Sequence, residues 1–454
     1  MHSRHLSSST VARPVAIGEH TVLDQFAFWQ RVHGLRRVLA AQPTRRVALV
    51  CDDSSWFAAG LLALAHAGRV CVVPQAPQAG SISASGAHID TVLTDRPADF
   101  AEFATLSVTR IPPASDSTPN LPDDNALIES YTSGSSGLPK CVPKTFGQLR
   151  REVATLEQQW GKQLGDALVC GTVPHYHLYG TLVRVLWPLL AGRSFVTRTC
   201  LQAADLRHWA TEQRCVIVSS PAFLSRIADL SVLPPATQVA AVFSSGAPLP
   251  DNCAERLQRD WGHAPIEIYG STETGGIGWR AWSGAAERPC WQLLPGMQAE
   301  LREESAGSRL WVKSGFTWQS DWMATGDLAR WHTDGRFVLL GRADDVVKLE
   351  DKRVSLSEMR TRLLTHAWVE NARLLLVEGR RRSIGAVVVL NAAGRAHLQA
   401  QGKIPVSREL RQWLRRSYEP VLLPRKWRFP EALPDNDMGK IEQSSLQQLF
   451  ASRA

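Results

Sequence analysis

The sequence of 454 residues contains no apolar run long enough to cross a membrane. A transmembrane helix needs about 20 consecutive apolar residues, and the candidate segment 185–192 (VLWPLLAG) is short and lies between Arg184 and Arg193. The first residues, MHSRHLSSSTVARP, lack the apolar segment of a secretory signal. We therefore expect a cytoplasmic protein without a membrane span, and a loose N-terminal tail.

Paired cysteines and metal-binding patterns are also missing. None of the eight cysteines lies in a C-x-x-C pair, which is typical of reduced thiols in a cytosolic protein. His175 and His177 lie two residues apart, but no third ligand is near them in the sequence, so a zinc site is a poor interpretation. No zinc-finger, RNA-recognition or heptad pattern occurs, and we do not expect nucleic acid as a partner.

Positive charge is concentrated at the C-terminal end. From Asp345 onward there are 20 Lys and Arg against 12 Asp and Glu, a balance of +8, which equals the net charge of the whole chain. The first 344 residues are therefore neutral. A solubilising surface explains such a segment, and so does a binding surface for an acidic partner such as a coenzyme phosphate or an acidic protein.

Apolar runs alternate with helical stretches from residue 46 onward. RVALVCDD (46–53) precedes the helix-like segment 56–68. Further strand-like runs lie at 70–74, 90–95, 167–174, 216–221, 239–246 and 266–273. This alternation predicts an α/β fold with parallel or mixed sheets, and the chain length predicts at least two domains, because single cores stop growing near ~250–300 residues.

Several of the strand-like runs end in small polar residues. These endings are TSGSSG at 132–137, SSP at 219–221, SSG at 244–246 and GSTE at 270–273. A turn alone explains each ending. Because ligands of open α/β sheets bind beyond the carboxyl ends of the strands, the four together predict one shared crevice.

The pattern changes near residue 308. Asp334-Gly335 is typical of a hairpin turn between antiparallel strands, and Ser355 with Glu358 forms a capping box that opens a helix. We predict a tail and first helix over 1–45 and a large N-terminal domain of layered mixed sheets and helices, with a β-rich subdomain, over 46–344. A small mobile α+β C-terminal domain follows over 345–454.

The loop YTSGSSGLPKCVPKT (131–145) joins the strand-like run 126–130 to a helix whose capping box is Thr145 with Gln148. One face of this helix is apolar, with Leu149, Val153, Leu156 and Trp160. The glycine spacing fits neither the P-loop nor the G-x-G-x-x-G pattern, which weakens the interpretation as a P-loop phosphotransferase. Hydroxyl-rich backbone with a lysine nevertheless suits phosphate binding.

This loop resembles the phosphate-loop signature of the adenylate-forming (AMP-binding) superfamily, which includes acyl- and aryl-CoA synthetases. Six more motifs follow in that family's order: VPHYHLYG (173–180), SSGAPL (244–249), YGSTE (269–273), TGD (325–327), GRADDVVK (341–348) and PDNDMGK (434–440). Residues 46–130 match more loosely and 1–45 not at all. The resemblance implies an ATP-dependent acid–thiol ligase. It would form an acyl-adenylate, release pyrophosphate and transfer the acyl group to CoA or to the phosphopantetheine of an acyl carrier protein.

The resemblance also implies catalytic roles. Lys440 would bridge the acid and the α-phosphate, although composition alone indicates a solvated surface lysine. Glu273 would hold Mg²⁺, a cation that prefers oxygen ligands, and Thr272 would donate its hydroxyl to the α-phosphate. His177 would border the acid pocket and gate the thiol tunnel. The pocket would also be lined by Gly180, Gly246 and Gly275.

Nucleotide contacts are implied in the same way. Asp327 would accept both ribose hydroxyls with support from Arg342, although Gly-Asp is also a common turn. The departing phosphates would contact the loop through Ser133, Gly134, Ser135, Ser136, Gly137 and Lys140. The strand ends would contribute Gly246, Ala247, Tyr269 and Gly270.

The acceptor half of the reaction depends on the C-terminal segment. By resemblance Asp344 is the hinge about which the C-terminal domain rotates between half-reactions. Asp351 stands where the family has glycine, which puts the thiol site in question. The compact chain resembles small ligases of aryl-polyene or polyketide pathways, which implies an aromatic or unsaturated acid. The basic C-terminal segment favours an acidic acyl carrier protein as the acceptor, although the phosphates of CoA would also fit it.

The alternative is a catalytically impaired nucleotide- or acyl-binding protein of the same fold. Retention of the phosphate loop with Lys440, Glu273 and Asp327 argues against it, because binding alone does not require all of them.

Overall fold

The computed structural model describes residues 13–115, 121–133, 139–211, 213–282, 289–349, 352–377, 382–434 and 443–451. The chain divides into two compact units. Unit 1 comprises Met1–Pro289, Leu293–Met297 and Lys313–Asp321, and unit 2 comprises Cys290–Gln292, Gln298–Val312 and Trp322–Ala454. The predicted boundary at Asp344 concerns a hinge between moving domains, and it stays a prediction.

One sheet of unit 1 has the strand order β6-β5-β3-β4-β7-β8. Its strands are β3 (Arg46–Val50), β4 (Val70–Val73), β5 (Thr91–Thr94), β6 (Thr105–Ser107), β7 (Leu127–Ser133) and β8 (Pro139–Thr145). All neighbours are parallel except β7 and β8, which form an antiparallel pair on either side of the predicted phosphate loop. The helix α2 (Ser54–His66) is buried on nearly all sides, because it is rich in Ala and Leu.

A second, mixed sheet of unit 1 runs in the order β14-β13-β12-β11-β9-β10-β1-β2. Its strands are β1 (Pro14–Ile17), β2 (Val22–Asp24), β9 (Leu168–Gly171), β10 (Phe195–Val196), β11 (Cys215–Ser219), β12 (Val239–Ser244), β13 (Ile266–Ser271) and β14 (Gly275–Ala281). The run from β10 to β13 is parallel, as predicted. The pairing of β1 with β10 was not predicted.

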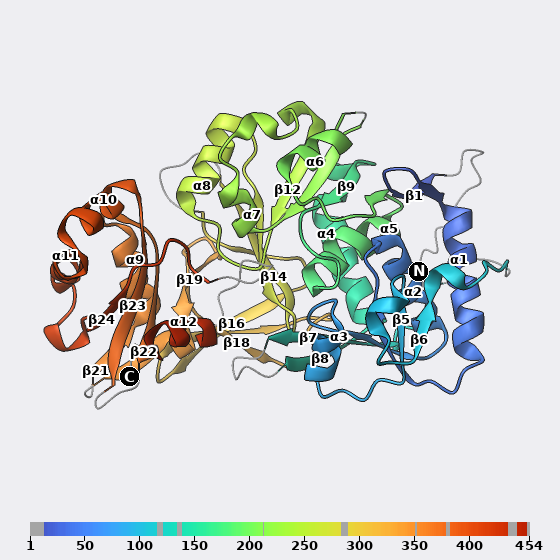
Figure 1. The fold of residues 1–454 in the computed structure, drawn as a ribbon, viewed down its shortest axis with the longest axis horizontal. Helices are drawn as coiled ribbons and strands as arrows, with labels where there is room; N and C mark the ends of the chain where they lie inside the picture. Colours follow the sequence, from blue (N-terminus) through green and yellow to red (C-terminus); the bar gives the residue numbers. More distant parts are fainter. Residues whose placement is uncertain are drawn as a thin grey trace. The chain divides into compact units, whose positions relative to one another are not determined.

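The helix α4 (Phe146–Leu164) packs against β8 of one sheet and β12 of the other (Figure 1). Its predicted apolar face and the Thr145–Gln148 capping box are confirmed. Trp160 packs edge-on against Phe243 of β12 and Trp279 of β14, at ring-centroid distances of 5.2 and 5.7 Å. A single hydrophobic core therefore joins α4 to both sheets.

Other helices of unit 1 connect the strands. They are α1 (Gln25–Ala40), α3 (Ala79–Ala84), α5 (Trp187–Ala191), α6 (Ala203–Trp209), α7 (Pro221–Arg226) and α8 (Asp251–Arg256). π-helical turns span Gly180–Leu186 and Leu257–Trp261.

Unit 2 begins with the sheet β16-β17-β18-β19. Its strands are β16 (Gln298–Glu304), β17 (Gly307–Lys313), β18 (Met323–Trp331) and β19 (Phe337–Arg342). The hairpin predicted at Asp334-Gly335 is confirmed, because β18 and β19 are antiparallel on either side of it.

The rest of unit 2 is α+β, as predicted. It contains β20 (Val346–Leu349), β21 (Lys352–Ser355), α9 (Leu356–Leu364), β22 (Val369–Val377), β23 (Ser383–Leu390), α10 (Ala392–Gln401), α11 (Lys403–Arg415), β24 (Lys426–Arg428) and α12 (Gln443–Ala451). α9 and α11 pack on one face of the β22-β23-β24 sheet, and α12 packs on the other. Ser355 caps α9 by accepting the Glu358 N–H.

Within the residues described, no helix combines the length and apolar character that crossing a bilayer requires.

Candidate nucleotide-binding site

Three of the four predicted polar strand ends lie at one edge of the mixed sheet. Ser219 at the end of β11 is paired in register with Ser244 at the end of β12. β13 runs parallel to β12, so Gly270 and the residues after it reach the same edge. Ser245 ties the ends together by donating its hydroxyl to the Ile268 carbonyl at 2.8 Å. The three strand ends therefore share one edge of the sheet, and the crevice predicted there stays a prediction.

Strand β8, which follows the fourth ending in the other sheet, meets this edge through an ion pair. Lys140 on β8 places its Nζ 2.6 Å from Oε1 of Glu273, which follows β13. The Trp318 ring lies 5.4 Å from the same Nζ. The Trp318 N–H donates to the Glu273 carbonyl at 2.7 Å. A predicted phosphate-binding lysine and a predicted metal-binding carboxylate are thus direct neighbours.

The environment of Glu273 favours its ionised form. Burial favours the neutral acid and by itself raises the pKa. The hydrogen bond and charge of Lys140, together with hydrogen bonds from the Glu273 backbone and the Ser271 side chain, outweigh burial, so the pKa of Glu273 lies below its usual value. A quarter of the Glu273 side chain stays exposed. Glu273 is therefore a charged oxygen ligand that already holds a cationic group, which fits a role in binding a hard divalent cation.

Glycine is required at two of the predicted positions. A Cβ atom on Gly270 would lie 2.1 Å from the Gly275 carbonyl oxygen. Gly275 has φ of +69°, and a Cβ there would lie 2.6 Å from Oε2 of Glu152. The chain after β13 therefore turns tightly, which leaves the backbone of Tyr269 to Gly270 accessible at the sheet edge.

Two buried charged residues next to this turn were missed by the sequence analysis. Lys144 is 1% exposed and Glu152 is 4% exposed. Burial lowers the pKa of Lys144 and raises that of Glu152, and each charge partly offsets the shift of the other. The sequence pattern could have predicted that both residues are buried. Lys144 is two residues from the buried Val142 on a strand, and Glu152 lies on the apolar face of α4.

The two histidines after β9 have different environments. His175 is buried, and its Nε2 donates to the Cys51 carbonyl at 2.8 Å. Burial lowers the pKa of His175 to about 3, so this ring is neutral and structural. His177 is only partly buried and stacks near Tyr176, with 4.8 Å between ring centroids. His177 is thus the more accessible of the two, and its role stays a prediction.

In unit 2, the two residues predicted to bind ribose are cross-strand partners. Asp327 on β18 pairs in register with Arg342 on β19. Arg342 covers Gly326, where a Cβ would lie 2.4 Å from the guanidinium. The neighbouring Thr325 hydroxyl accepts the Asp327 N–H at 3.1 Å.

Several predicted residues lie outside the described part of the chain. They are Gly134, Ser135, Ser136, Gly137, Asp351 and Lys440, together with the side chains of Ser133 and Asp344. Their roles stay predictions.

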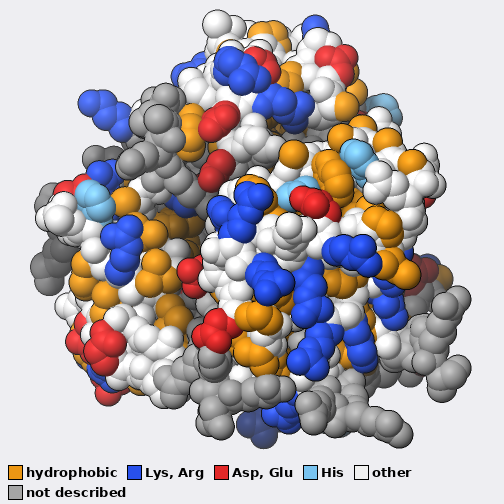
Figure 2. Space-filling view, turned by 90° about the vertical axis from the view of Figure 1, so that its left-hand side faces the viewer, with side chains coloured by type: hydrophobic (Ala, Val, Ile, Leu, Met, Phe, Trp, Pro, Cys, Tyr) orange, Lys and Arg blue, Asp and Glu red, His pale blue; other side chains and the backbone are white. Residues whose placement is uncertain are grey.

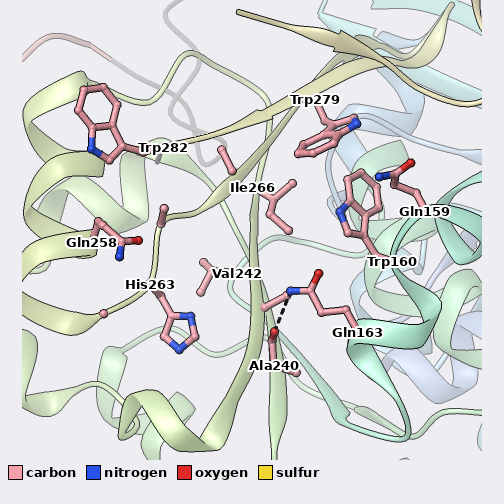
Figure 3. A pocket seen from close by; sticks show the side chains of 14 residues that line it. Gln159, Trp160, Gln163, Ala240, Val242, Gln258, His263, Ile266, Trp279 and Trp282 are labelled. Carbon is pink, nitrogen blue, oxygen red and sulfur yellow. Dashed lines mark hydrogen bonds between the residues drawn. The ribbon is translucent and has the colours of Figure 1, made fainter. Parts of the chain in front are cut away.

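A separate hollow of about 460 Å³ opens at the amino-terminal ends of β12 and β13, away from these residues. Figure 3 shows Trp160, Trp279 and Trp282 around it, with Gln163 bonded to the Ala240 carbonyl at 3.2 Å. None of the predicted site residues lines it. Within the described residues, no group of three or more His, Cys, Asp or Glu side chains is placed to hold a metal ion.

The chain belongs to the AMP-binding enzyme family, whose model matches residues 12–313. This confirms the predicted superfamily. Among individual relatives, the 4-coumarate–CoA ligase of Rhodobacter capsulatus is 30% identical over 311 residues, which cover 68% of this chain and 73% of that protein. The malonate–CoA ligase of Arabidopsis thaliana is 23% identical over 478 residues, covering 88% and 77%.

Solved structures share the fold over nearly the whole chain. ATP-bound MatB from Rhodopseudomonas palustris superposes with a TM-score of 0.82 at 20% identity, covering 98% of this chain and 97% of that one. The O-succinylbenzoate CoA synthetase of Bacillus subtilis in complex with AMP gives a TM-score of 0.76 at 17% identity, covering 96% and 95%. The predicted α/β fold with a C-terminal α+β part is confirmed.

Proposed function

We propose that this protein is an ATP-dependent acid–thiol ligase that activates a carboxylic acid as an acyl-adenylate and transfers the acyl group to CoA. The Lys140–Glu273 pair at the sheet edge carries the proposal. It joins a cation suited to phosphates to a carboxylate suited to Mg²⁺. The names of the relatives, 4-coumarate–CoA and malonate–CoA ligase, support CoA as the acceptor.

In the first half-reaction an oxygen of the acid attacks the α-phosphorus of ATP, and the bond to pyrophosphate breaks. Both reactants are anionic, so catalysis consists mainly of positioning and charge neutralisation. Lys140 would bind the departing phosphates, and Glu273 would hold Mg²⁺, which neutralises phosphate charge. Thr272 would donate to the α-phosphate, and Lys440 would bridge the α-phosphate and the acid.

Further residues would contact the nucleotide. Asp327 and Arg342 would hold the ribose hydroxyls. Ser133 to Gly137 would surround the phosphates, while Gly246, Ala247, Tyr269 and Gly270 would border the base and the acid. These assignments rest on motif matches and on the accessibility of the sheet edge.

In the second half-reaction the thiol sulfur attacks the acyl carbon, and AMP leaves. His177 would border the thiol path, and the C-terminal domain would rotate about Asp344 to present the acceptor side. We propose an aromatic or unsaturated acid as the substrate. The eight cysteines are all free thiols, which supports a cytoplasmic location.

An acidic acyl carrier protein is proposed as an additional acceptor. Ile404, Arg408, Arg411 and Arg415 recur at helical spacing along the outward side of α11. Ile404, Arg408 and Arg415 are exposed. Figure 2 views the side on which α11 lies in Figure 1 and shows Lys and Arg side chains gathered there. A basic surface of this kind complements an acidic protein.

The test is acid-dependent exchange of labelled pyrophosphate into ATP with a panel of aromatic and aliphatic acids. Exchange with at least one acid is expected. Lys440→Ala should abolish exchange and leave transfer from a pre-made acyl-adenylate to CoA intact. ATP binding without exchange for any acid would favour the catalytically impaired alternative.

A further inference from the structure

The segment 314–318, called the strap below, lies between β17 and β18 in the sequence. Both strands belong mainly to unit 2, but residues Lys313–Asp321 belong to unit 1. The strap therefore packs as part of unit 1, and the chain continues from it into β18, the strand that carries Asp327. Specific bonds must hold it in this position.

Three consecutive backbone carbonyls of the strap are held by side chains of β8 and α4. The donors are Arg151 Nε (2.7 Å to Gly315 O), Lys144 Nζ (2.6 Å to Phe316 O) and Gln148 Nε2 (2.7 Å to Thr317 O). Gln148 and Arg151 lie three residues apart on α4 and therefore project from the same side of this helix. Lys144 lies on β8, two residues before the helix begins. The backbone of the strap is therefore fixed residue by residue.

Among the three donors, Lys144 has the largest desolvation penalty, because its ammonium group is buried. A lysine is rarely buried completely, and taking an ammonium group out of water is unfavourable unless it is bonded. Its Nζ bonds to the Phe316 carbonyl, and the charges of Glu152 and Glu273 act on it from nearby. An apolar residue would fill this core position at lower cost, which indicates that the bond to the strap has a role beyond packing.

The last residue of the strap, Trp318, is hydrogen-bonded to Glu273. The Trp318 N–H donates to the Glu273 carbonyl at 2.7 Å, and the Trp318 ring lies 5.4 Å from the Lys140 Nζ that pairs with the Glu273 carboxylate. On the other side of Glu273, the Gly276 N–H donates to Oε1 of Glu152 at 2.7 Å. The backbone at Glu273 is thus held from both sides by groups anchored on α4 and the strap.

We propose that Lys144, together with Arg151 and acting through the strap, is a positioning residue that aims the Glu273 carboxylate at the divalent cation of the metal–nucleotide complex. This inference rests on the proposed function, since it assigns Glu273 to the cation. It predicts that loosening the strap weakens metal binding more than nucleotide binding.

The test uses the full chain and compares binding of Mn²⁺ and of a non-hydrolysable ATP analogue with an α,β-methylene bridge. Electron paramagnetic resonance gives the Kd of Mn²⁺ in the presence of the analogue, and calorimetry gives the Kd of the analogue without metal. Lys144→Met should raise the Kd of Mn²⁺ about tenfold, the usual effect of losing a hydrogen bond to a charged group. It should change the metal-free Kd less than twofold.

Arg151→Met and Arg150→Met form a matched pair that does not disturb the core. Both arginines lie on α4 with about half of the side chain exposed, at 49% and 44%. Arg151 bonds to the strap, whereas Arg150 bonds to Asp124. Arg151→Met should raise the Kd of Mn²⁺ about threefold, and Arg150→Met should leave it unchanged.

The outcomes separate the two proposals. Equal loss of metal and nucleotide binding in Lys144→Met and Arg151→Met would show a general structural role and overturn the inference, as would unchanged Mn²⁺ binding in both. A wild-type protein that binds Mn²⁺ with the analogue but exchanges no pyrophosphate with any acid would overturn the proposed function and leave the positioning role supported. A wild-type protein that does not bind Mn²⁺ with the analogue would overturn both.

Discussion

In unit 1, the hollow lies at one edge of the mixed sheet and the charged candidate site lies at the other edge. The amino-terminal edge has a hollow of about 460 Å³ lined by tryptophan and glutamine, with no Lys, Arg, Asp or Glu among its lining residues. The carboxyl-terminal edge carries the Lys140–Glu273 ion pair and the tight turn at Gly275. Charge and accessible backbone, rather than the size of a cavity, locate the candidate chemistry.

The contrast follows from how parallel strands are built. Their carboxyl ends share an edge where loops diverge and ligands bind. Beside the hollow, the Trp160 ring packs against the rings of Phe243 and Trp279. Those rings contribute to the stability of the core. Substitutions at the carboxyl-terminal edge should therefore change activity, and substitutions beside the hollow should change stability.

The largest effect on activity is expected for Glu273→Gln. The change keeps the shape of the side chain and removes the charge that would bind the cation, so pyrophosphate exchange should fall at least about 100-fold. Glu255→Gln on the exposed side of α8 is the control and should keep full activity. Exchange within threefold of wild type in Glu273→Gln would remove Glu273 from the mechanism.

Lys140→Met should reduce exchange by about tenfold and change its pH dependence. The pKa of Glu273 is lowered in the folded protein because Lys140 and two further hydrogen bonds, from its own backbone and from Ser271, together outweigh burial. Without Lys140, burial dominates and this pKa rises, so activity should begin to fall at a higher pH on the acidic side. The measurement is exchange between about pH 4 and 8 in both proteins. An unchanged acidic limb would separate Lys140 from the ionisation of Glu273.

The same pair links folding to pH. A carboxyl group whose pKa is lowered by folding stabilises the protein above its unfolded pKa, and this contribution is lost as the pH falls through the folded pKa. Because Lys140 is half exposed, the pair should contribute only about 1 kcal/mol or less. Urea unfolding of wild type and Lys140→Met at about pH 7 and at about pH 3 tests this, and the difference in stability should be smaller at pH 3 than at pH 7.

Beside the hollow, Trp160→Ala should lower the stability of the protein and leave pyrophosphate exchange nearly unchanged. Trp160 is 4% exposed and contacts three aromatic rings. Its loss should lower the free energy of unfolding by about 3–5 kcal/mol. Exchange per folded molecule at low temperature should stay within about twofold. A tenfold loss of exchange in fully folded protein would mean that the hollow belongs to the reaction.

The smallest effect is expected for Gln163→Leu, also at the hollow. It removes one partly buried hydrogen bond to Ala240, so the stability should fall by about 1 kcal/mol. Exchange should not change. A selective change in the preferred acid would show that the hollow accommodates part of the substrate.

Regular patterns allowed much of the fold to be predicted from the sequence. The apolar face and capping box of α4 are confirmed, because periodicity and caps depend on neighbouring residues. Asp327 and Arg342 are cross-strand partners around the predicted hairpin. The polar ends of β11, β12 and β13 share one edge of the mixed sheet, as expected.

Contacts between distant segments could not be predicted in this way. The bond of Lys144 to Phe316 joins residues 172 positions apart and uses a backbone carbonyl, which every residue carries. The pairing of β1 with β10 likewise depends on an edge that exists only after the sheet forms. Ser355 caps α9, but the reciprocal Glu358 bond of a capping box is not formed between these two described residues. The roles of Lys440 and Asp344 stay predictions.

The close approach of Glu152 to Gly275 has a consequence for attempts to redesign the choice of acid. Gly275→Ala alone would place a methyl group against the carboxylate and in an unfavourable backbone conformation. Shortening Glu152 relieves only the first problem, and it releases the Gly276 N–H. Libraries that vary one position at a time should therefore return only glycine at position 275, which is predicted to line the acid pocket. Access to new specificities requires coordinated changes on α4 and on the turn.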